Sequence, residues 1–288
     1  MLYRNLLIIL FVFAKFHSYQ GCTTTKNKID LPCKEYDLNK PVVLKLGDPL
    51  AEISGISFYP KDSSVFAISD DNGNLYKIHL NKNTLTEKWK FDIVHDFEEV
   101  LLHDSSFFVL EGNGNVQAFN FSVKGDTIFK RKNIFPAGNK KKNEFESMYY
   151  DEESKRLIVI CKNCEAENKN SVSAWSLDPA SGSYTPSVFS IDVNAISKKT
   201  GKEQKLQPSA AAINPLTNDV WILASMNQLL IVTDRKGNTK EVFTLNPLIF
   251  NQPEGITFTT SGDMLICNEV GDKYDTPTLL FFKLQKRG

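Results

Sequence analysis

Five short segments of the chain share a residue pattern that could bring oxygen ligands together. Each segment holds a polar residue, an apolar one, a Glu or Ser, a small or polar residue and a second apolar one. The central positions recur every 44 to 48 residues, except for one gap of 63, and are Ser54, Glu98, Glu146, Ser209 and Glu254. Carboxylate and hydroxyl oxygens at equivalent positions of a repeat are donors that a hard cation such as Ca²⁺ prefers.

Strand signals follow each of these segments and show what could position them. Short runs rich in apolar and β-branched residues alternate with turn dipeptides such as Asn-Gly, Gly-Asn, Lys-Gly and Asp-Pro. Four short antiparallel strands in each repeat of this length are typical of a propeller blade. The sequence therefore predicts an all-β fold, a β-propeller of five four-stranded blades. Six blades is the alternative, if the long gap between Glu146 and Ser209 holds a degenerate blade.

The last repeat is one strand short, because the chain ends soon after the segment 278–284. A strand-like segment, Val42–Leu46, precedes the first repeat and has no blade of its own. We expect this N-terminal strand to close the last blade and so remove an open sheet edge. We expect no helix in the domain, and the polar insertion Ser197–Lys205 is predicted to be an exposed loop.

The repeat also predicts where the acidic side chains meet. The first strand of each blade lines the central channel, and the end of the antiparallel second strand lies at the same face as its start. Carboxylates brought together raise one another's pKa unless a cation is present. The predicted metal ligands are Glu98, Glu146, Glu254, Asp70, Glu111 and Glu269. The alternative is that these groups only accept hydrogen bonds from neighbouring blades. The scarcity of His argues against zinc or iron.

The segment Asp70–Asn74 has the composition of a calcium loop but lacks the bidentate Glu of an EF-hand. A type I′ hairpin turn at Asn72-Gly73 explains it, and a further ligand role stays open.

Cys161 and Cys164 form a C-x-x-C pair without a second pair at zinc-finger spacing. We interpret them as a strand-end loop with a local disulfide or two free thiols.

The N-terminus predicts export. Arg4 precedes a nine-residue apolar run, Leu6–Ala14, which is too short to span a bilayer and fits a signal peptide. The run leads to Gly21-Cys22, as in a lipoprotein cleavage site, so Cys22 is the predicted lipidation site. Simple secretion, an uncleaved anchor and a buried first element are the alternatives. The expected organisation is a signal peptide over 1–21, a tether over 22–40 and one propeller domain over 41–288.

Composition limits the partners. Hydrophobic residues make up 41% of the chain and charged residues 24%, as in an ordinary globular domain. Lys plus Arg and Asp plus Glu each number 34. Without a basic excess we expect no nucleic-acid partner. The expected partner is a membrane, bound through the lipid anchor. The expected location is the bacterial cell envelope, facing the periplasm or the cell surface.

Several motifs resemble the SdiA-regulated (YjiK/CarP) family of bacterial envelope β-propellers. They are ISGISF at 53–58, SDDNGNLY at 69–76, FESMYYD at 145–151, QPSAAAI at 207–213, QPEGITF at 252–258 and CNE at 267–269. The resemblance implies a membrane-associated propeller linked to calcium, with the ion at the central channel and no established catalysed reaction. By position, it implies that Glu98, Glu146 and Glu254 are acidic ligands. Ser54 and Ser209 stand where further acids would complete the ring.

Two functions from different classes remain. The first, which we favour, is a non-catalytic calcium-binding propeller that acts as a scaffold or in a calcium-related response. The second is a calcium-dependent hydrolase of the lactonase, phosphotriesterase or phytase type that uses the same site. A hydrolase needs a base near the ion, and His95 is the candidate because it is the one His close to the predicted ring.

Overall fold

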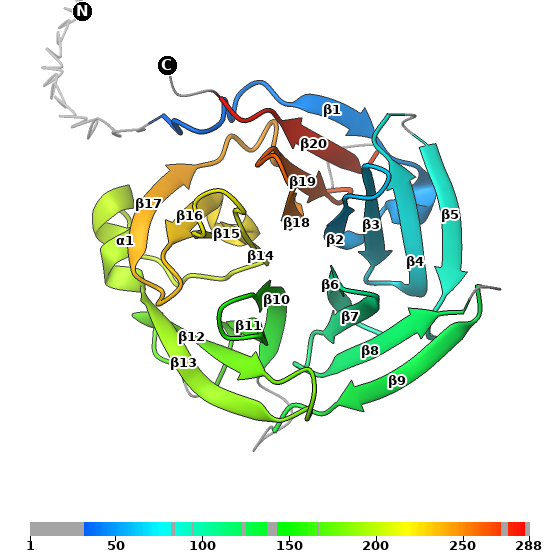
Figure 1. Ribbon diagram of the computed structural model, residues 1–288. Helices are drawn as coiled ribbons and strands as arrows, with labels where there is room; N and C mark the ends of the chain where they lie inside the picture. The colour runs from blue at the N-terminus through cyan, green and yellow to red at the C-terminus, as the bar shows by residue number, and fades with distance from the viewer. Residues whose placement is uncertain are drawn as a thin grey trace, which may run out of the picture.

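The fold was described from a computed structural model, which covers residues 32–285 except 82–83, 94, 123–124, 137–142, 166 and 272–275. Five four-stranded antiparallel sheets surround a central axis, so the chain forms a five-bladed β-propeller (Figure 1). The fold predicted from the sequence is confirmed. The long gap between Glu146 and Ser209 holds no sixth blade.

The first three blades each follow the chain in order from the axis outward. Blade 1 consists of β2 (Ile53–Tyr59), β3 (Ser64–Ser69), β4 (Asn72–His79) and β5 (Thr84–Lys90). Blade 2 consists of β6 (Phe97–His103), β7 (Ser106–Glu111), β8 (Val116–Phe121) and β9 (Thr127–Asn133). Blade 3 consists of β10 (Glu144–Asp151), β11 (Arg156–Asn163), β12 (Ser171–Leu177) and β13 (Tyr184–Asp192).

The fourth blade repeats this order and the fifth combines both ends of the chain. Blade 4 consists of β14 (Ala210–Ile213), β15 (Val220–Ala224), β16 (Leu229–Thr233) and β17 (Thr239–Thr244). Blade 5 consists of β18 (Pro253–Phe258), β19 (Met264–Asn268), β20 (Thr278–Phe282) and, outermost, β1 (Val42–Lys45). The first strand of every blade is innermost, as predicted (Figure 1).

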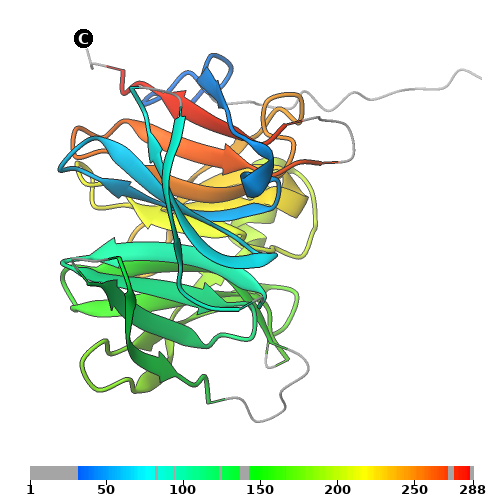
Figure 2. The ribbon, with the colours of Figure 1, turned by 90° about the vertical axis from the view of Figure 1, so that its right-hand side faces the viewer.

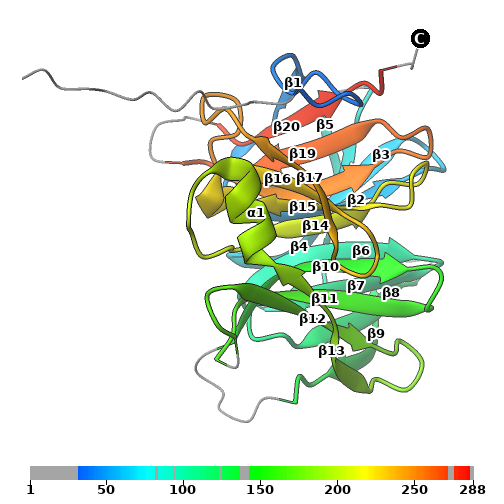
Figure 3. The ribbon, with the colours of Figure 1, turned by 90° about the vertical axis from the view of Figure 1, so that its left-hand side faces the viewer.

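The core is divided among the interfaces between blades. Five clusters of buried apolar side chains each join two neighbouring blades. In β3, Val65 and Ala67 pack toward blade 5, whereas Phe66 and Ile68 pack toward blade 2. A strand buried on both faces reads as a continuous apolar run. The side views show the blades lying face to face (Figures 2 and 3).

The N-terminal segment closes the ring. β1 pairs with β20 along its whole length, and the backbone N–H of Leu46 donates to the carbonyl of Pro277 (2.8 Å). Upstream, Tyr36 is 1% exposed and packs between blades 4 and 5. Its hydroxyl donates to the carbonyl of Gly262 (2.6 Å) and accepts from Asn214 (2.9 Å). The predicted closure by an N-terminal strand is confirmed.

The expectation of no helix was wrong. The helix α1 (Val193–Thr200) is capped at its N-terminus by Asp192, whose carboxylate accepts from the Asn194 backbone N–H, and at its C-terminus by Gly201, which has a φ of 70°. It covers part of the outer surface near β12 and β17 (Figure 3). The predicted loop Ser197–Lys205 is thus half helical. The reason is that Val193 and Ile196 give a short amphipathic stretch that buries against blades 3 and 4.

The remaining connections include two single-turn 3₁₀ helices, η1 (Asp48–Leu50) and η2 (Ser225–Asn227). Within the part of the chain that the structure describes, none of the helices combines the length and apolar character needed to cross a bilayer.

The turn predicted at Asn72-Gly73 lies two residues earlier, because Ser69 pairs with Asn72 and leaves Asp70-Asp71 as the turn.

Deleting residues 40–46 should abolish cooperative unfolding. The deletion removes the outer strand of blade 5 and uncovers both β20 and the apolar groups that Leu44 covers. Circular dichroism melts compare this deletion with a control that starts at residue 32. A deletion variant that melts like the control would contradict a structural role for closure.

Candidate metal centre

A β-bulge in the first strand of four blades falls at the repeated Glu or Ser. In β6 the pairing with β7 skips Glu98, and in β10 and β18 it skips Glu146 and Glu254 in the same way. The pairing of β2 with β3 skips Ser54. Ser209 precedes β14, and its N–H donates to Leu223, the residue that also faces Ala210. A bulge turns a side chain out of the pleat. In blades 2, 3 and 5 the residue at the bulge is an acid, Glu98, Glu146 or Glu254.

The two serines of the repeat join blades rather than complete an acidic ring. Ser54 donates its hydroxyl hydrogen to the carbonyl of Phe97 in the next blade (2.7 Å). Ser209 donates in the same way to the carbonyl of Pro253 (2.9 Å). Their hydroxyl groups are therefore committed to the backbone, which leaves three repeat positions with acids.

The three acids come close enough to influence one another. Burial, followed by the charges of Glu146 and Asp96, raises the pKa of Glu98 to about 9. Burial, followed by the charges of Glu146 and Glu269, raises the pKa of Glu254 well above its usual range. We define these three residues, Glu98, Glu146 and Glu254, as the acidic ring. The charge of Glu146 thus acts on both of the other acids of the ring.

Lys162, at the end of β11, carries a positive charge within the acidic ring. Its ammonium pairs with the carboxylate of Glu146. Burial alone would lower the pKa of Lys162, but Glu146, Glu254 and Glu98 hold it above its ordinary value. Burial still raises the pKa of Glu146, although this ammonium opposes the shift. The pair is the electrostatic centre of the site, because both members act on the pKa of Glu98, Glu254 and Glu269.

A second layer of acids lies beside the ring at the strand ends. Burial, and then Glu52 and Asp70, raise the pKa of Glu269 to about 8. Burial, and then Glu52 and Asp71, raise the pKa of Asp70 to about 6. The structure thus brings these two predicted ligands to the channel mouth, the end of the channel at which the first strands begin and the second strands end. It also adds Glu52, which the sequence reasoning passed over because it occupies the first rather than the central position of its repeat.

Blade 2 contributes Asp96 where the sequence predicted Glu111. A Cβ atom at Gly112 would collide with the carboxylate of Asp96 and would lie 3.0 Å from Glu98 Oε1. The bare glycine therefore makes room for both acids. Asp96 was missed for the same reason as Glu52, since it stands first in its repeat segment.

Glu111 faces a different set of partners. Its carboxylate pairs with the ammonium of Lys132 (2.6 Å) and accepts from Gln117 (2.8 Å) and Asn115 (3.1 Å). These donors outweigh burial and lower its pKa. The structure therefore does not bring Glu111 to the acidic ring. The imidazole of His95 lies 3.9 Å from the carboxylate of Asp92 and packs edge-on against Phe97.

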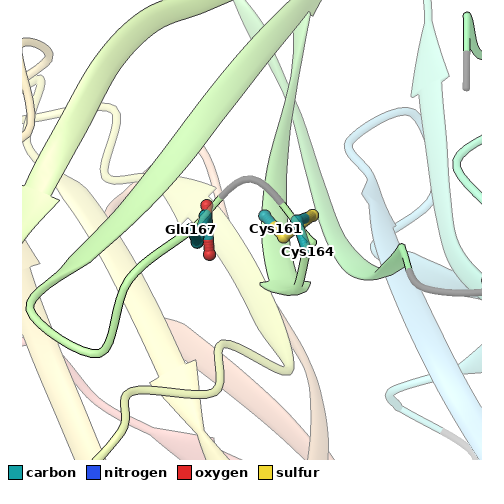
Figure 4. A group of neighbouring side chains, drawn as sticks. All are labelled: Cys161, Cys164 and Glu167. Carbon is teal, nitrogen blue, oxygen red and sulfur yellow. A yellow bond between two sulfur atoms is a disulfide. The ribbon is translucent and has the colours of Figure 1, made fainter. Parts of the chain in front are cut away.

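Cys161 and Cys164 form a disulfide at the end of β11 (Figure 4). With Glu167 they are the one group of three His, Cys, Asp or Glu residues in the described chain whose ligand atoms all lie within 4.8 Å of one another. Because the two sulfurs are bonded to each other, this group serves as a cross-link. The disulfide brackets Lys162 and anchors the backbone from which its side chain enters the acidic ring.

The donor atoms at the channel mouth are carboxylate and amide oxygens, the type that a hard cation prefers. Asp70 Oδ1, Glu146 Oε2 and Asn268 Oδ1 are buried and accept no hydrogen bond from the described residues. An orphaned buried oxygen costs free energy unless a cation or a donor satisfies it. Among the described residues, the carboxylate oxygens of Glu98, Glu146 and Glu254 do not all lie within 4.8 Å of one another. A Ca²⁺ ion would therefore need side-chain rotation or bridging water, which its variable coordination of six to eight oxygens permits.

The fold and the acidic channel mouth define the protein as a β-propeller with a polar central channel. The sequence model of the SdiA-regulated family matches residues 34–274, so the chain belongs to that family. A search of curated proteins finds no match to the sequence.

Solved structures share the propeller fold at low identity. A glutaminyl cyclase from Myxococcus xanthus is 12% identical, with a TM-score of 0.57 over 85% of this chain and 97% of that one. A regucalcin from Agrobacterium tumefaciens, described as a calcium-binding protein, is 12% identical, with a TM-score of 0.52 over 83% and 92%. A gluconolactonase from Xanthomonas campestris is 11% identical, with a TM-score of 0.52 over 86% and 91%.

The thermal stability of the metal-free protein should fall as the pH rises from 6 to 9. The folded-state pKa values of Glu98 and Glu269 are about 9 and about 8, whereas an unfolded Glu titrates at about 4.3. The folded state binds more protons over this range, so its stability is present at low pH and is lost as these groups ionise. Melting curves with a chelator measure the slope.

Glu98→Gln should flatten this slope, because the amide does not titrate. Glu111→Gln is the matched control, since the pKa of Glu111 is lowered and its titration ends below this range. It should lower the melting temperature at every pH without changing the slope. An unchanged slope in Glu98→Gln would show that ring protonation does not couple to folding.

Proposed function

We propose that this member of the SdiA-regulated family is a non-catalytic Ca²⁺-binding propeller of the bacterial cell envelope. It acts as a scaffold or in a calcium-related response. The observation that supports the proposal is the acidic ring. Its three residues, Glu98, Glu146 and Glu254, stand at the bulges of three blades and lie together at one channel mouth. Glu269 and Asp70 lie beside them, and their pKa values are raised in part by neighbouring acids.

The charge balance favours a cation as the ligand. Like charges held together in a partly buried site must be neutralised by protons or by a positive ion. The raised pKa values of Glu98 and Glu254 show how strongly the site resists uncompensated ionisation. A divalent ion would let these groups ionise and would supply a partner for Asp70 Oδ1 and Glu146 Oε2. Binding would therefore release protons at neutral pH.

Lys162 competes with a metal cation for the carboxylate of Glu146. Its ammonium already compensates part of the negative charge through Glu146. A cation that approaches Glu146 has to displace this ammonium or share the carboxylate with it. Lys162 thus lowers the affinity for Ca²⁺ and raises the concentration at which the site responds. Two variants of the same ion pair should consequently change calcium affinity in opposite directions.

Ca²⁺ should raise the melting temperature more than Mg²⁺ does, because Mg²⁺ gives up its waters reluctantly. A ligand that binds only the folded state stabilises it by about 2.7 kcal/mol at a hundredfold excess over the dissociation constant. Glu146→Gln should weaken this effect and Lys162→Gln should strengthen it, each by about tenfold in affinity. Glu111→Gln is the control outside the ring.

Titration calorimetry in two buffers of different ionisation enthalpy measures both affinity and proton release. The apparent binding enthalpy should differ between the buffers, since Glu98 and Glu269 enter the reaction protonated. Absence of Ca²⁺ binding in wild type and in Lys162→Gln would leave the ring as hydrogen-bonded structure and remove the basis of the proposal.

A calcium-dependent hydrolase of the lactonase, phosphotriesterase or phytase type is the second candidate. One observation favours it: the pKa values of Asp70, about 6, and Glu269, about 8, lie on either side of neutrality at one mouth. Groups tuned in this way can exchange protons with a substrate at neutral pH. His95, the base predicted from the sequence, remains a hypothesis. A panel of lactone and phosphoester substrates, assayed with and without Ca²⁺, separates the two candidates.

The proposed envelope location rests on the N-terminal sequence, which lies outside the described residues. Lipid on Cys22 would attach the propeller to a membrane through the tether over 22–40. Cys22→Ala should release the protein from the membrane fraction and abolish incorporation of labelled palmitate, as fractionation of expressing cells would show. Persistence of both properties in the variant would rule out this anchor.

A further inference from the structure

A cleft lies beside the outer strands of blade 3, and we call it the rim cleft. Its volume is about 710 Å³, which is within the range of small-molecule sites. Its walls come from the connection between β9 and β10, the loop between β11 and β12, and the strands β12 and β13. Both connections lie at the end of the propeller that carries the channel mouth, but none of the ring acids lines the cleft.

An irregularity in the outermost strand shapes the rim cleft. The pairing of β12 with β13 is regular up to Ala174 and resumes two residues later, so that residues 186–188 of β13 face Trp175 alone. Pro186 has no N–H to donate to the ladder, and Ser187 has a φ of 49°, in the left-handed region that residues other than glycine rarely adopt. Backbone strain of this kind is concentrated at functional sites.

At the end nearest the channel mouth, β12 has two unlike faces. Val172 and Ala174 are buried against blade 4. Ser171, Ser173 and Trp175, on the opposite face, are only partly buried and line the rim cleft. The equivalent strand of blade 4, β16, is buried along its whole length. Core packing therefore does not account for the half-exposed face of β12.

Trp175 provides an aromatic surface in the rim cleft. Its ring meets that of Phe135 nearly at a right angle, with centroids 4.7 Å apart, and the side chain is still partly exposed. Its indole N–H makes no hydrogen bond to the described residues. The face of an aromatic ring carries partial negative charge and attracts polarised C–H groups. Trp175 thus offers a ring face and one donor to a ligand.

Hydroxyl and amide groups make up much of the remaining wall. Ser190 lies directly across from Ser173 in the strand pair, and its hydroxyl group makes no hydrogen bond to the described residues. Hydroxyl and amide groups both donate and accept hydrogen bonds. Six such side chains line the cleft: Asn143, Asn168, Ser171, Ser173, Ser187 and Ser190.

The charges of the wall disfavour an anionic ligand. No Lys, Arg or His among the described residues lines the rim cleft, whereas Glu165 and Glu167 do. Glu167 Oε1 accepts from the hydroxyl of Ser173 (2.6 Å) and from its backbone N–H. Oε2 of Glu167 makes no hydrogen bond to the described residues and is not shut off from solvent. The Cys161–Cys164 disulfide holds the start of the loop that carries Glu167 (Figure 4).

We propose that the rim cleft binds a neutral saccharide. A pyranose ring has a face of C–H groups, which packs on Trp175, and a rim of hydroxyl groups, which exchange hydrogen bonds with the serines, the asparagines and Glu167 Oε2. An amine would match the two acids but would leave the serine and asparagine side chains without partners. This inference is independent of the calcium proposal, because it uses none of the ring acids.

Fluorine NMR of protein labelled with 5-fluorotryptophan tests the proposal. The chain has three tryptophans, of which Trp221 is 2% exposed and Trp89 stacks on Phe121, so these two are internal references for Trp175. The probes are the methyl glycosides of glucose, galactose, mannose and N-acetylglucosamine. At least one should shift the Trp175 signal selectively, with a dissociation constant on the order of 1 mM for so small a ligand. No selective shift with any of the four would overturn the proposal.

Two variants locate the sugar, with binding measured by saturation-transfer NMR on the ligand. Trp175→Leu keeps an apolar contact to Phe135 but removes the ring face, and Ser190→Val replaces an exposed hydroxyl by a side chain that suits a strand. Each should weaken binding by about tenfold. Trp89→Leu is the matched control, since it removes a stacked indole from blade 1, and it should keep the wild-type affinity. Wild-type affinity in both Trp175→Leu and Ser190→Val would reject the cleft.

Tetramethylammonium separates a saccharide site from an amine site. Glu167→Gln removes a charge but keeps an oxygen acceptor, so it should weaken sugar binding by less than about tenfold. Tetramethylammonium should not shift the Trp175 signal. A Trp175 shift with tetramethylammonium that is lost in Glu167→Gln, together with no shift for the sugars, would assign the cleft to amines and overturn the proposal.

Discussion

The structure depends on the fact that every blade is apolar on both faces. A sheet of this kind cannot remain at an open end, because either face left to solvent would expose a row of large side chains. The ring must therefore close, and β1 on β20 closes it with backbone hydrogen bonds from the opposite end of the chain. Tyr36 adds an apolar contact between blades 4 and 5 just before that strand. Closure fixes the five first strands around one axis.

In a closed ring of repeats, residues at the same repeat position of different blades lie around one central axis. In blades 2, 3 and 5 a bulge falls at the repeated Glu, so acids at three repeat positions converge although they are far apart in the sequence. Their mutual repulsion is relieved by protonation and by Lys162. Ser54 and Ser209 limit the number of charges and instead hold neighbouring blades together. Natural proteins accept such local conflicts mainly at functional sites.

The fold was predictable because it is periodic, and the misses have physical causes. The blade period, the closing strand and the convergence of Glu98, Glu146 and Glu254 all follow from the repeat. Glu111 was misplaced because the turn after β7 directs its carboxylate to Lys132. Gly112, in the same turn, leaves space for Asp96, which was passed over because it stands first in its repeat segment and not at the central position. The helix α1 was missed because eight residues, about two turns, with two buried side chains are too few for a clear 3.6-residue period.

The bulge in β6 places two carboxyl groups, those of Glu98 and Glu99, next to each other in the sequence of one strand. It places Glu98 in the acidic ring and the next residue, Glu99, against Gly55 of blade 1. The charge of Glu98 contributes to the raised pKa of Glu99, so the two carboxyls oppose each other's ionisation. A cation that ionises Glu98 also brings a compensating positive charge to the ring. The proton on Glu99 then depends on the net charge of the ring rather than on Glu98 alone. Because Oε1 of Glu99 is held by the backbone amides of Val100 and Ile56, this influence acts on the contact between blades 1 and 2.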